Sequence, residues 1–215
     1  EDLNTQFLVS TVNIEENGSK TPVNYILPPK IRREVDVTTT NLQQLNEQAL
    51  QLRVCNLNDG DARAVFKTTN LDIRAYKKLK MEVHAESMNN NGWPDNQITC
   101  FIRLGTDFSN NYYEYEIPLK RCPDGATNPE TVWNNSFDFS LEELVNAKIK
   151  RNKEMLSNPQ MKLNEPYYAS DPNVPGSRIT VMGVPQVSGL KTIMIGIRNP
   201  QNDEDNPWPD DGAVA

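Results

Sequence analysis

Apolar and polar residues alternate in most of the sequence between residues 49 and 200, and this alternation limits the chain to a mostly β fold. The clearest run covers residues 79–86, where Leu, Met, Val and Ala alternate with Lys, Glu, His and Glu. A period of two places one set of side chains on the buried face of a strand and the other set in solvent. Similar runs lie at residues 50–55, 62–67, 98–104, 112–119, 137–139, 179–181 and 193–197.

These runs amount to seven or eight short strands with turn signals between them. Such a series predicts a β-sandwich or jelly roll, similar to carbohydrate-binding or galactose-binding-like modules. Asn58, Asp59 and Gly60 form one of the turn signals. One short helix interrupts the strands, because Ser140 and Glu143 have the spacing of a capping box. Its predicted apolar face consists of Leu141, Leu144, Val145 and Ile149.

The composition divides the chain into three parts. Residues 1–48 are predicted to form an extended N-terminal arm, since they contain two consecutive prolines and little alternation. Residues 49–200 form the predicted β-sandwich domain, in which residues 156–177 are a long loop rich in Pro, Asn and Tyr. Residues 201–215 are predicted to be an acidic tail that contains prolines.

The charge argues against two classes of partner, and the apolar stretches are too short for a membrane-spanning helix. The net charge of −7 argues against nucleic acid or an anionic membrane surface as the main partner, because both attract basic surfaces. The chain begins at Glu1 without an initiator methionine or an apolar leader, as expected for a mature segment or a piece of a longer protein. The longest strongly apolar stretch, Ile193–Ile197, is far shorter than the roughly 20 residues of a membrane-spanning helix.

The sequence contains none of the usual catalytic motifs. Its one histidine, His84, falls on the predicted solvent face of a strand, and no nucleophile or orienting acid is spaced to meet it. Glu114 and Glu116 share one face of a strand, and glycosidases use two carboxylates at a set separation. A surface acid pair is the commoner arrangement, so a hydrolase is the weaker hypothesis and no catalytic residue is assigned.

Acidic side chains in loops are the candidate metal ligands. Asp59 and Asp61 lie in one turn, and Asp210 and Asp211 lie near the C-terminus. Carboxylate oxygens are the ligands that calcium prefers. The segment around Asp59 is too short for an EF-hand loop, so a hydrogen-bonded turn is the alternative to a structural calcium site. No other cofactor is predicted.

The three cysteines leave the redox state open. Cys55, Cys100 and Cys122 are an odd number, and none of them belongs to a C-x-x-C motif. Buried or partly buried thiols are favoured, with one disulfide as the alternative.

Four aromatic side chains are candidates for ligand binding. Trp93, Trp133 and Trp208 lie in loop-like sequence beside Pro or Asn, and Tyr112 lies on the strand face opposite to Tyr113. Many sugar-binding modules present aromatic rings as platforms, so a carbohydrate-binding module at the cell surface is the alternative function. The other interpretation is that the indoles anchor their own loops.

Several strings of residues, taken in order, resemble one known family. They are residues 21–25 (TPVNY), 33–36 (REVD), 41–48 (NLQQLNEQ), 59–65 (DGDARAV), 76–81 (YKKLKM), 101–105 (FIRLG), 110–116 (NNYYEYE) and 192–200 (TIMIGIRNP). In this order they resemble the SprA/Sov family, giant outer-membrane proteins of Bacteroidetes that are associated with gliding motility and the type IX secretion system. The resemblance covers nearly all 215 residues.

The resemblance implies a role in protein export. The family forms a very large transmembrane barrel that serves as a translocon, and this chain would be a soluble structural or interaction module of it. The implied partners are the rest of the same translocon chain, a PorV-type barrel protein, a periplasmic plug protein and secreted cargo. The implied location is the outer membrane, with the extracellular and the periplasmic side both open. The family brings no catalytic residues.

The sequence departs from the family pattern in two places. It has Pro28-Pro29-Lys30 where the family pattern leads us to expect Pro-Pro-Gly, which suggests a different turn. The family pattern also continues into a further strand after an Asp-Asp-Gly string like the one that begins at Asp210. If that strand completes the sandwich, the chain as given has an open strand edge.

Overall fold

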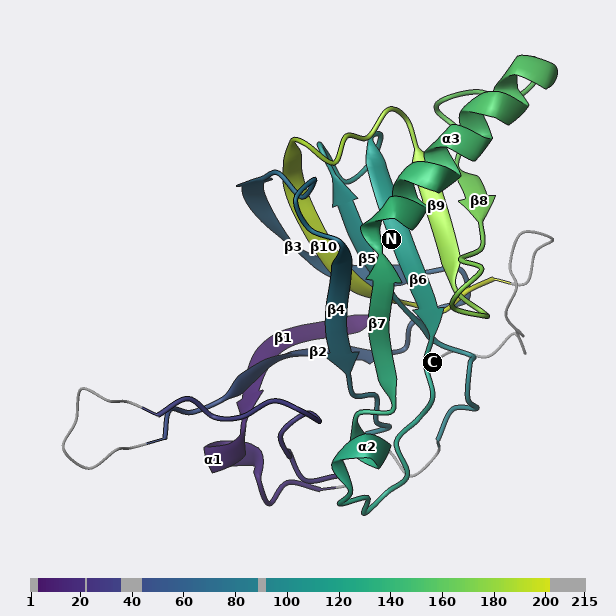
Figure 1. Cartoon of the computed structure of the whole chain (residues 1–215). Coiled ribbons are helices and arrows are strands. Elements are labelled where there is room, and N and C mark those ends of the chain that lie inside the picture. Colours follow the sequence, from purple (N-terminus) through teal and green to yellow (C-terminus); the bar gives the residue numbers. More distant parts are fainter. Residues whose placement is uncertain (1–3, 22, 36–43, 89–91, 202–215) are drawn as a thin grey trace.

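The structure is a computed structural model that describes residues 4–21, 23–35, 44–88 and 92–201. Within these residues the chain forms ten strands and three helices, so the predicted mostly β class is confirmed. Figure 1 shows one large sheet, with a long helix and a strand pair in front of it and a two-stranded ribbon below. This is a sandwich-like arrangement of the kind that the alternating pattern predicts.

Six antiparallel strands form the large sheet in the order β3-β10-β5-β6-β9-β8. Their bounds are Ala62–Leu71 (β3), Leu190–Arg198 (β10), Thr99–Gly105 (β5), Tyr112–Pro118 (β6), Arg178–Met182 (β9) and Tyr167–Ala169 (β8). The strand β8 lies inside residues 156–177, so the prediction of a loop there is wrong for three residues. A strand this short shows no period in the sequence, and only its pairing with β9 defines it.

A second layer covers one face of the large sheet, which we name the core face. The layer consists of β4 (Lys78–Val83), β7 (Asn135–Ser140) and α3 (Leu141–Ser157), with β4 and β7 paired antiparallel. The Tyr115 ring of β6 stacks on the Phe139 ring of β7, with the ring centroids 3.8 Å apart. Tyr113 and Tyr115 are 2% and 1% exposed in this core, as the alternation along β6 predicts. We name the opposite face of the large sheet the outer face.

Helix α3 begins where the sequence predicts. The Ser140 side chain caps it and accepts a hydrogen bond from the Glu142 N–H at 3.3 Å. The predicted apolar face is wrong in the second half of the helix, because Ile149 is 46% exposed. Arg151 lies on the buried face instead, and its guanidinium donates to the Gly183 carbonyl at 2.7 Å. The buried residues of the helix are Leu141, Leu144, Ala147 and Arg151.

The N-terminal part forms a two-stranded antiparallel ribbon. Strand β1 (Gln6–Asn13) pairs with β2 (Gln48–Cys55) over their whole lengths. Helix α1 (Ile14–Asn17) follows β1 and adds a short helix to the one that the sequence predicts. The ribbon pairs residues from both sides of the predicted domain boundary at residue 48. The boundary itself stays a prediction.

A second, small core attaches residues 23–26 to the loop after β6. The buried side chains of this core are Val23, Cys122 and Val132, with Ile26, Ala126 and Trp133 partly buried around them. Val132 lies in the short helix α2 (Pro129–Val132). The Trp133 Nε1–H donates to the Ile26 carbonyl at 3.0 Å. The predicted extended arm is therefore packed against the rest of the molecule at this point.

Lys30 adopts a conformation that favours glycine. Its φ angle is 70°, in the left-handed region of the backbone map. A side chain in this region costs roughly 1–2 kcal/mol, because the Cβ atom approaches the following carbonyl oxygen. This is the position at which the family resemblance leads us to expect glycine. The turn is thus a glycine-type turn even though the residue is lysine.

We expect the replacement of Leu144 by Ala to lower the free energy of unfolding by about 3 kcal/mol. Leu144 is 1% exposed and packs in the core, so the shorter side chain leaves a cavity. Leu156 lies on the same helix and is 88% exposed, so Leu156→Ala is the matched control with a change within about 0.5 kcal/mol. Chemical denaturation of both variants measures the difference. Equal effects of the two substitutions would contradict the packing of α3 on the sheet.

Candidate functional site

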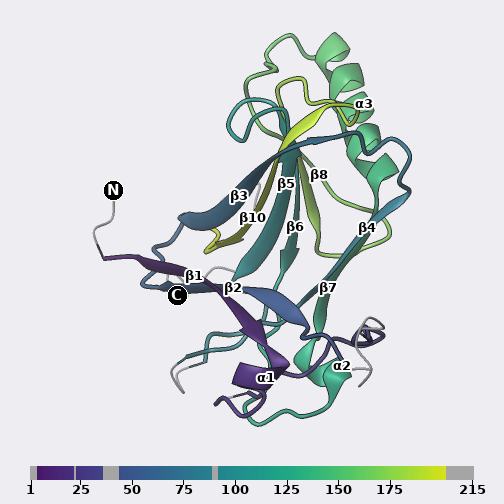
Figure 2. The same cartoon turned by 90° about the vertical axis from the view of Figure 1, so that its left-hand side faces the viewer.

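A cavity of about 840 Å³ lies between the ribbon and the sandwich. One wall is β2 with its next residue, Ala49–Asn56, and another is the end of β4 with the segment after it, Met81–Met88. Ile195 and Ile197 of β10 and Cys100 of β5 also line the cavity, from the core face. Figure 2 shows how the ribbon crosses below the two layers, so that the cavity is bounded by three separate sheets.

The core face is incompletely covered beside this cavity. Ile102 of β5 and Tyr115 of β6 are 3% and 1% exposed, because β4, β7 and α3 lie over them. Ile193 and Ile195 of β10, in contrast, are only partly buried. Lys67 pairs with Ile193 across β3 and β10, lies on the same face and is exposed. The second layer is therefore narrower than the sheet that it covers.

Two of the predicted aromatic candidates line the cavity. Trp93 packs against the main core and Trp133 against the small core, and each is partly buried. The Trp133 ring meets the Tyr25 ring edge-on, with the centroids 6.1 Å apart. Tyr112 lies on the outer face and does not line the cavity, and Trp208 lies outside the described residues. Because neither described indole is an exposed flat platform, no specific observation favours the carbohydrate-binding hypothesis.

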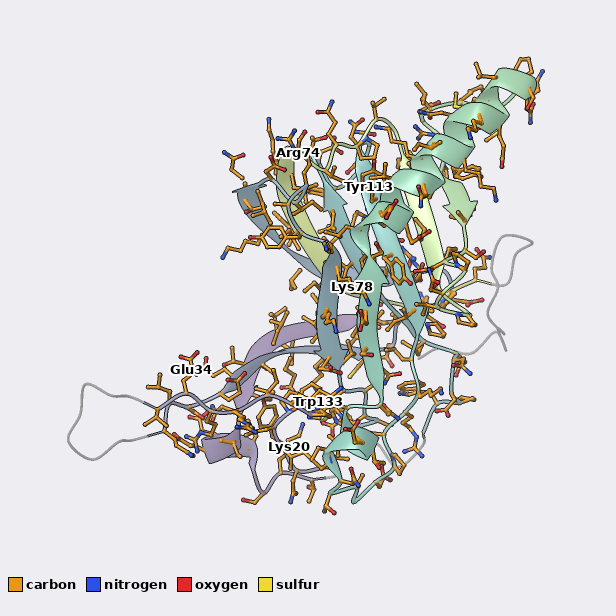
Figure 3. The ribbon with its side chains drawn as sticks, in the orientation of Figure 1. Lys20, Glu34, Arg74, Lys78, Tyr113 and Trp133 are labelled. Atoms are coloured by element: carbon orange, nitrogen blue, oxygen red, sulfur yellow. The ribbon has the colours of Figure 1, made fainter. Side chains whose placement is uncertain are left out.

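Three polar side chains form a bridge at the edge of the cavity. The His84 Nδ1 lies 2.7 Å from the Val132 carbonyl oxygen, and its Nε2 lies 3.2 Å from Glu86 Oε2. The Lys20 ammonium binds the other oxygen of the same carboxylate. Figure 3 places Lys20 and Trp133 at this end of the molecule. The bridge joins the residues after α1 to the residues after β4.

His84 is not on the solvent face, so that prediction is wrong. Its side chain is 18% exposed. Strand β4 ends at Val83, and the alternation that the prediction extends to residue 86 has no structural basis beyond that point. Burial alone would raise the pKa of the Glu86 carboxyl, but the hydrogen bonds from His84 and Lys20 outweigh burial and hold its pKa below the usual value. No sequence signal links Lys20 to Glu86.

The candidate calcium ligands do not meet within the described residues. The turn that contains Asp59 and Asp61 is attached to Asn199, whose carbonyl accepts from the Gly60 N–H at 2.8 Å. The Asp61 carboxylate lies 3.8 Å from the Arg63 guanidinium. Asp210 and Asp211 lie outside the described part of the chain. In that part, no group of three or more His, Cys, Asp or Glu side chains is arranged to hold a metal ion, and the calcium hypothesis stays a prediction.

The carboxylates of Glu114 and Glu116 are buried on the outer face, 2% and 0% exposed. Arg103 donates to Glu114 through two nitrogens at 2.8 and 2.6 Å. Arg178 donates to Glu116 at 2.9 Å, and Arg198 binds both carboxylates. The Thr99 hydroxyl also donates to Glu116. We name these five charged residues the outer-face network.

Aromatic rings complete the outer-face network. The Arg103 guanidinium lies over the Tyr112 ring, with its central carbon 3.9 Å from the ring centroid, and the Arg198 guanidinium lies 4.6 Å from the Phe101 centroid. Burial alone would lower the pKa of Arg198, but the two glutamates outweigh it and raise its pKa. Both glutamates are thus bound to arginines, and neither lines the cavity. A glycoside hydrolase would instead require two carboxylates that flank its substrate.

The three cysteines are free thiols. Burial raises the pKa of the Cys100 thiol to about 12 and also raises the pKa of Cys122. A thiol with a raised pKa is a poor nucleophile. Cys100 and Cys122 therefore behave as apolar side chains of the main core and the small core.

Comparison with known proteins gives a match over almost the whole chain. The family model SprA_N, described as motility related/secretion protein, matches residues 1–211. No curated protein matches the chain. In the described residues, no helix has both the length and the apolar character that crossing a membrane requires.

We expect Glu86→Gln to lower the free energy of unfolding by about 1 kcal/mol at neutral pH, because the bridge loses its charge. The folded-state pKa of Glu86 lies below its usual value of 4.5, so the carboxylate stabilises the fold above pH 4.5. This stabilisation disappears as the pH falls through the folded-state value, and the variant and the wild type converge there. Urea denaturation between pH 7 and pH 3 measures the convergence, with Glu82→Gln as the exposed control. A difference that persists at the lowest pH contradicts the assignment.

We expect Glu116→Gln to lower the free energy of unfolding by about 3 kcal/mol, because it removes a buried negative charge that binds Arg178 and is one of the two carboxylates that bind Arg198. The matched control is Asp138→Asn, which removes an exposed carboxylate that also binds two cations, Lys78 and Lys80. Its effect should stay below about 1 kcal/mol. Thermal and chemical unfolding measure both. An effect of Glu116→Gln as small as that of Asp138→Asn would contradict the burial of these paired charges on the outer face.

Proposed function

Because the chain belongs to the SprA_N family of motility related/secretion proteins, we propose that it is a structural or interaction module of a giant outer-membrane translocon. The translocon is that of type IX secretion, which is associated with gliding motility in Bacteroidetes. The observation that carries the proposal is the family match over residues 1–211. The module has no catalytic step in this proposal, and its work is to bind.

The proposed partners follow from the same family context. They are the rest of the same translocon chain, a PorV-type barrel protein, a periplasmic plug protein and secreted cargo. The proposed location is the outer membrane, at a part of the translocon that lies outside the lipid. An acidic surface with a net charge of −7 suits protein partners better than nucleic acid.

The ribbon supports an interaction role. Leu8 and Val9 are neighbours on β1, so their side chains point to opposite faces, and they are 58% and 49% exposed. Leu50 of β2 is 49% exposed. An isolated two-stranded ribbon is only marginally stable in water, and apolar side chains on both of its faces gain stability when a partner covers them. We propose that these exposed apolar side chains of the ribbon pack on another part of the translocon.

The test uses the chain as bait in an extract of outer membranes from a gliding bacterium that carries the translocon. We expect mass spectrometry to find a barrel partner, the plug protein or secreted cargo enriched with the wild-type chain. Leu8→Glu combined with Val9→Glu should reduce the recovery at least fivefold, because a charged ribbon is not covered by an apolar partner, and neither residue lines the cavity. Leu156→Glu, at the exposed end of α3, is the matched control and should leave it unchanged.

A genetic measurement accompanies the bait experiment. Removal of this segment from the full translocon protein should abolish cargo secretion and gliding, and the ribbon variant should reduce both. Normal secretion and gliding after removal of the segment would refute the proposed function. Recovery of the same proteins by wild type and ribbon variant would refute the role of the ribbon alone.

A further inference from the structure

The second layer of the sandwich ends at β4. Among the residues that the structure describes, β4 pairs with β7 on one side and no strand pairs with its outer edge. The N–H and C=O groups along an unpaired edge are available to another extended backbone. Leu79, Met81 and Val83 of β4 point inward and pack against the core, while Lys80 and Glu82 are exposed. One face of β4 therefore already packs on the core and the other meets solvent, and a new strand would add contacts only along the outer edge.

The space beside this edge has an apolar floor. Ile193, Ile195 and Ile197 of β10 lie on the core face with a period of two, and they are only partly buried. The cavity brings Met81 and Val83 of β4 beside Ile195 and Ile197. A strand placed beside β4 would lie in the second layer and over these isoleucines, at the usual separation of about 10 Å between packed sheets.

The shape of the cavity also fits an extended chain. Consecutive residues of two segments line it, Ala49–Asn56 and Met81–Met88. Only Met81, Glu82 and Val83 of the second segment belong to β4, so the cavity is a groove between β2 and the end of β4.

We propose that this groove binds an extended segment of a partner protein, which pairs with the outer edge of β4 and becomes the third strand of the second layer. The segment has about six residues, which is the length of β4. Every second side chain is apolar and contacts the isoleucines of β10, and the others are polar and face solvent. The inference deepens the proposed function and rests on it for the identity of the partner as a translocon or cargo protein.

The chemistry of the groove favours this occupant over the others. A small apolar molecule would fill the floor but leave the N–H and C=O groups of β4 without partners. A strand satisfies both requirements at once, since its backbone pairs with β4 and its alternate side chains cover Ile193, Ile195 and Ile197.

The test begins with a phage-displayed library of random octapeptides, selected on the purified chain. We expect the selected peptides to alternate apolar and polar residues. A synthetic copy of the best peptide should slow hydrogen exchange at residues 78–83. Methylation of every second backbone nitrogen of this peptide, on the side that pairs with β4, should weaken binding at least tenfold, because it removes the pairing donors and keeps the side chains.

Two substitutions in β10 provide matched variants. Ile195→Glu places a charge in the floor and should weaken peptide binding at least tenfold, whereas Met194→Glu, one residue away on the outer face, should change it less than twofold. Both residues are partly buried, so the comparison controls for loss of stability. The peptide and exchange experiments use the wild-type chain and decide the matter even if Ile195→Glu does not fold.

Several results would overturn the proposal. They are the absence of any selected peptide, equal binding of the methylated peptide, or slowed exchange at β3 in place of β4. Dimers in sedimentation that Ile195→Glu dissociates would assign the groove to a second copy of this chain. Displacement of the peptide by a fatty acid that does not slow exchange at β4 would assign it to a small apolar ligand. Peptide binding together with normal secretion after removal of the segment would keep this inference and refute the proposed function.

Discussion

The stacking of Tyr115 on Phe139 holds the two layers of this protein together. The rings are 3.8 Å apart and nearly parallel, and they join the centre of the large sheet to β7. Because β7 leads directly into α3 and pairs with β4, this contact also sets the position of the helix and the second strand. The second layer consequently covers β5, β6 and β9 and stops short of β10. The groove between β2 and β4 is the result of where that layer stops.

The two faces of the large sheet are covered in different ways. Side chains of β4, β7 and α3 cover the core face, whereas the outer face covers itself with charged and aromatic side chains. Arg103, Arg178 and Arg198 bind two buried glutamates and lie over aromatic rings, so a layer of guanidinium groups covers the outer face. Burial of such a layer costs desolvation and gives little net stability. Removal of one member nevertheless destabilises the fold strongly, because a buried charge loses its partner. The layer joins side chains of four neighbouring strands, β10, β5, β6 and β9.

Much of the fold could be predicted from the alternation of residues, and most of the site could not. The alternation places Tyr113 and Tyr115 in the core, because a period of two along a strand is a local signal. It does not show that Glu114 and Glu116 on the other face of β6 are buried as well. The site depends on contacts between residues that are far apart in sequence, such as Lys20 with Glu86 and Arg198 with Glu114. Short elements such as β8 also escape prediction. Lys30 shows a third limit, since its backbone keeps a glycine-type turn that lysine itself does not indicate.

The place of β10 in the sheet has a consequence for the order in which the protein can fold. Strand β3 spans residues 62–71, and its neighbour in the sheet is β10, at residues 190–198. A chain that emerges from the ribosome or from a membrane channel with its N-terminus first exposes β3 long before β10 is available to pair with it. Pairing of strands so far apart in the sequence is slow, because closing the long loop between them costs entropy before the pairing contributes stability. The large sheet is therefore complete only after the end of β10 has emerged. Until then β3 lacks its neighbour in the sheet and can pair with other chains.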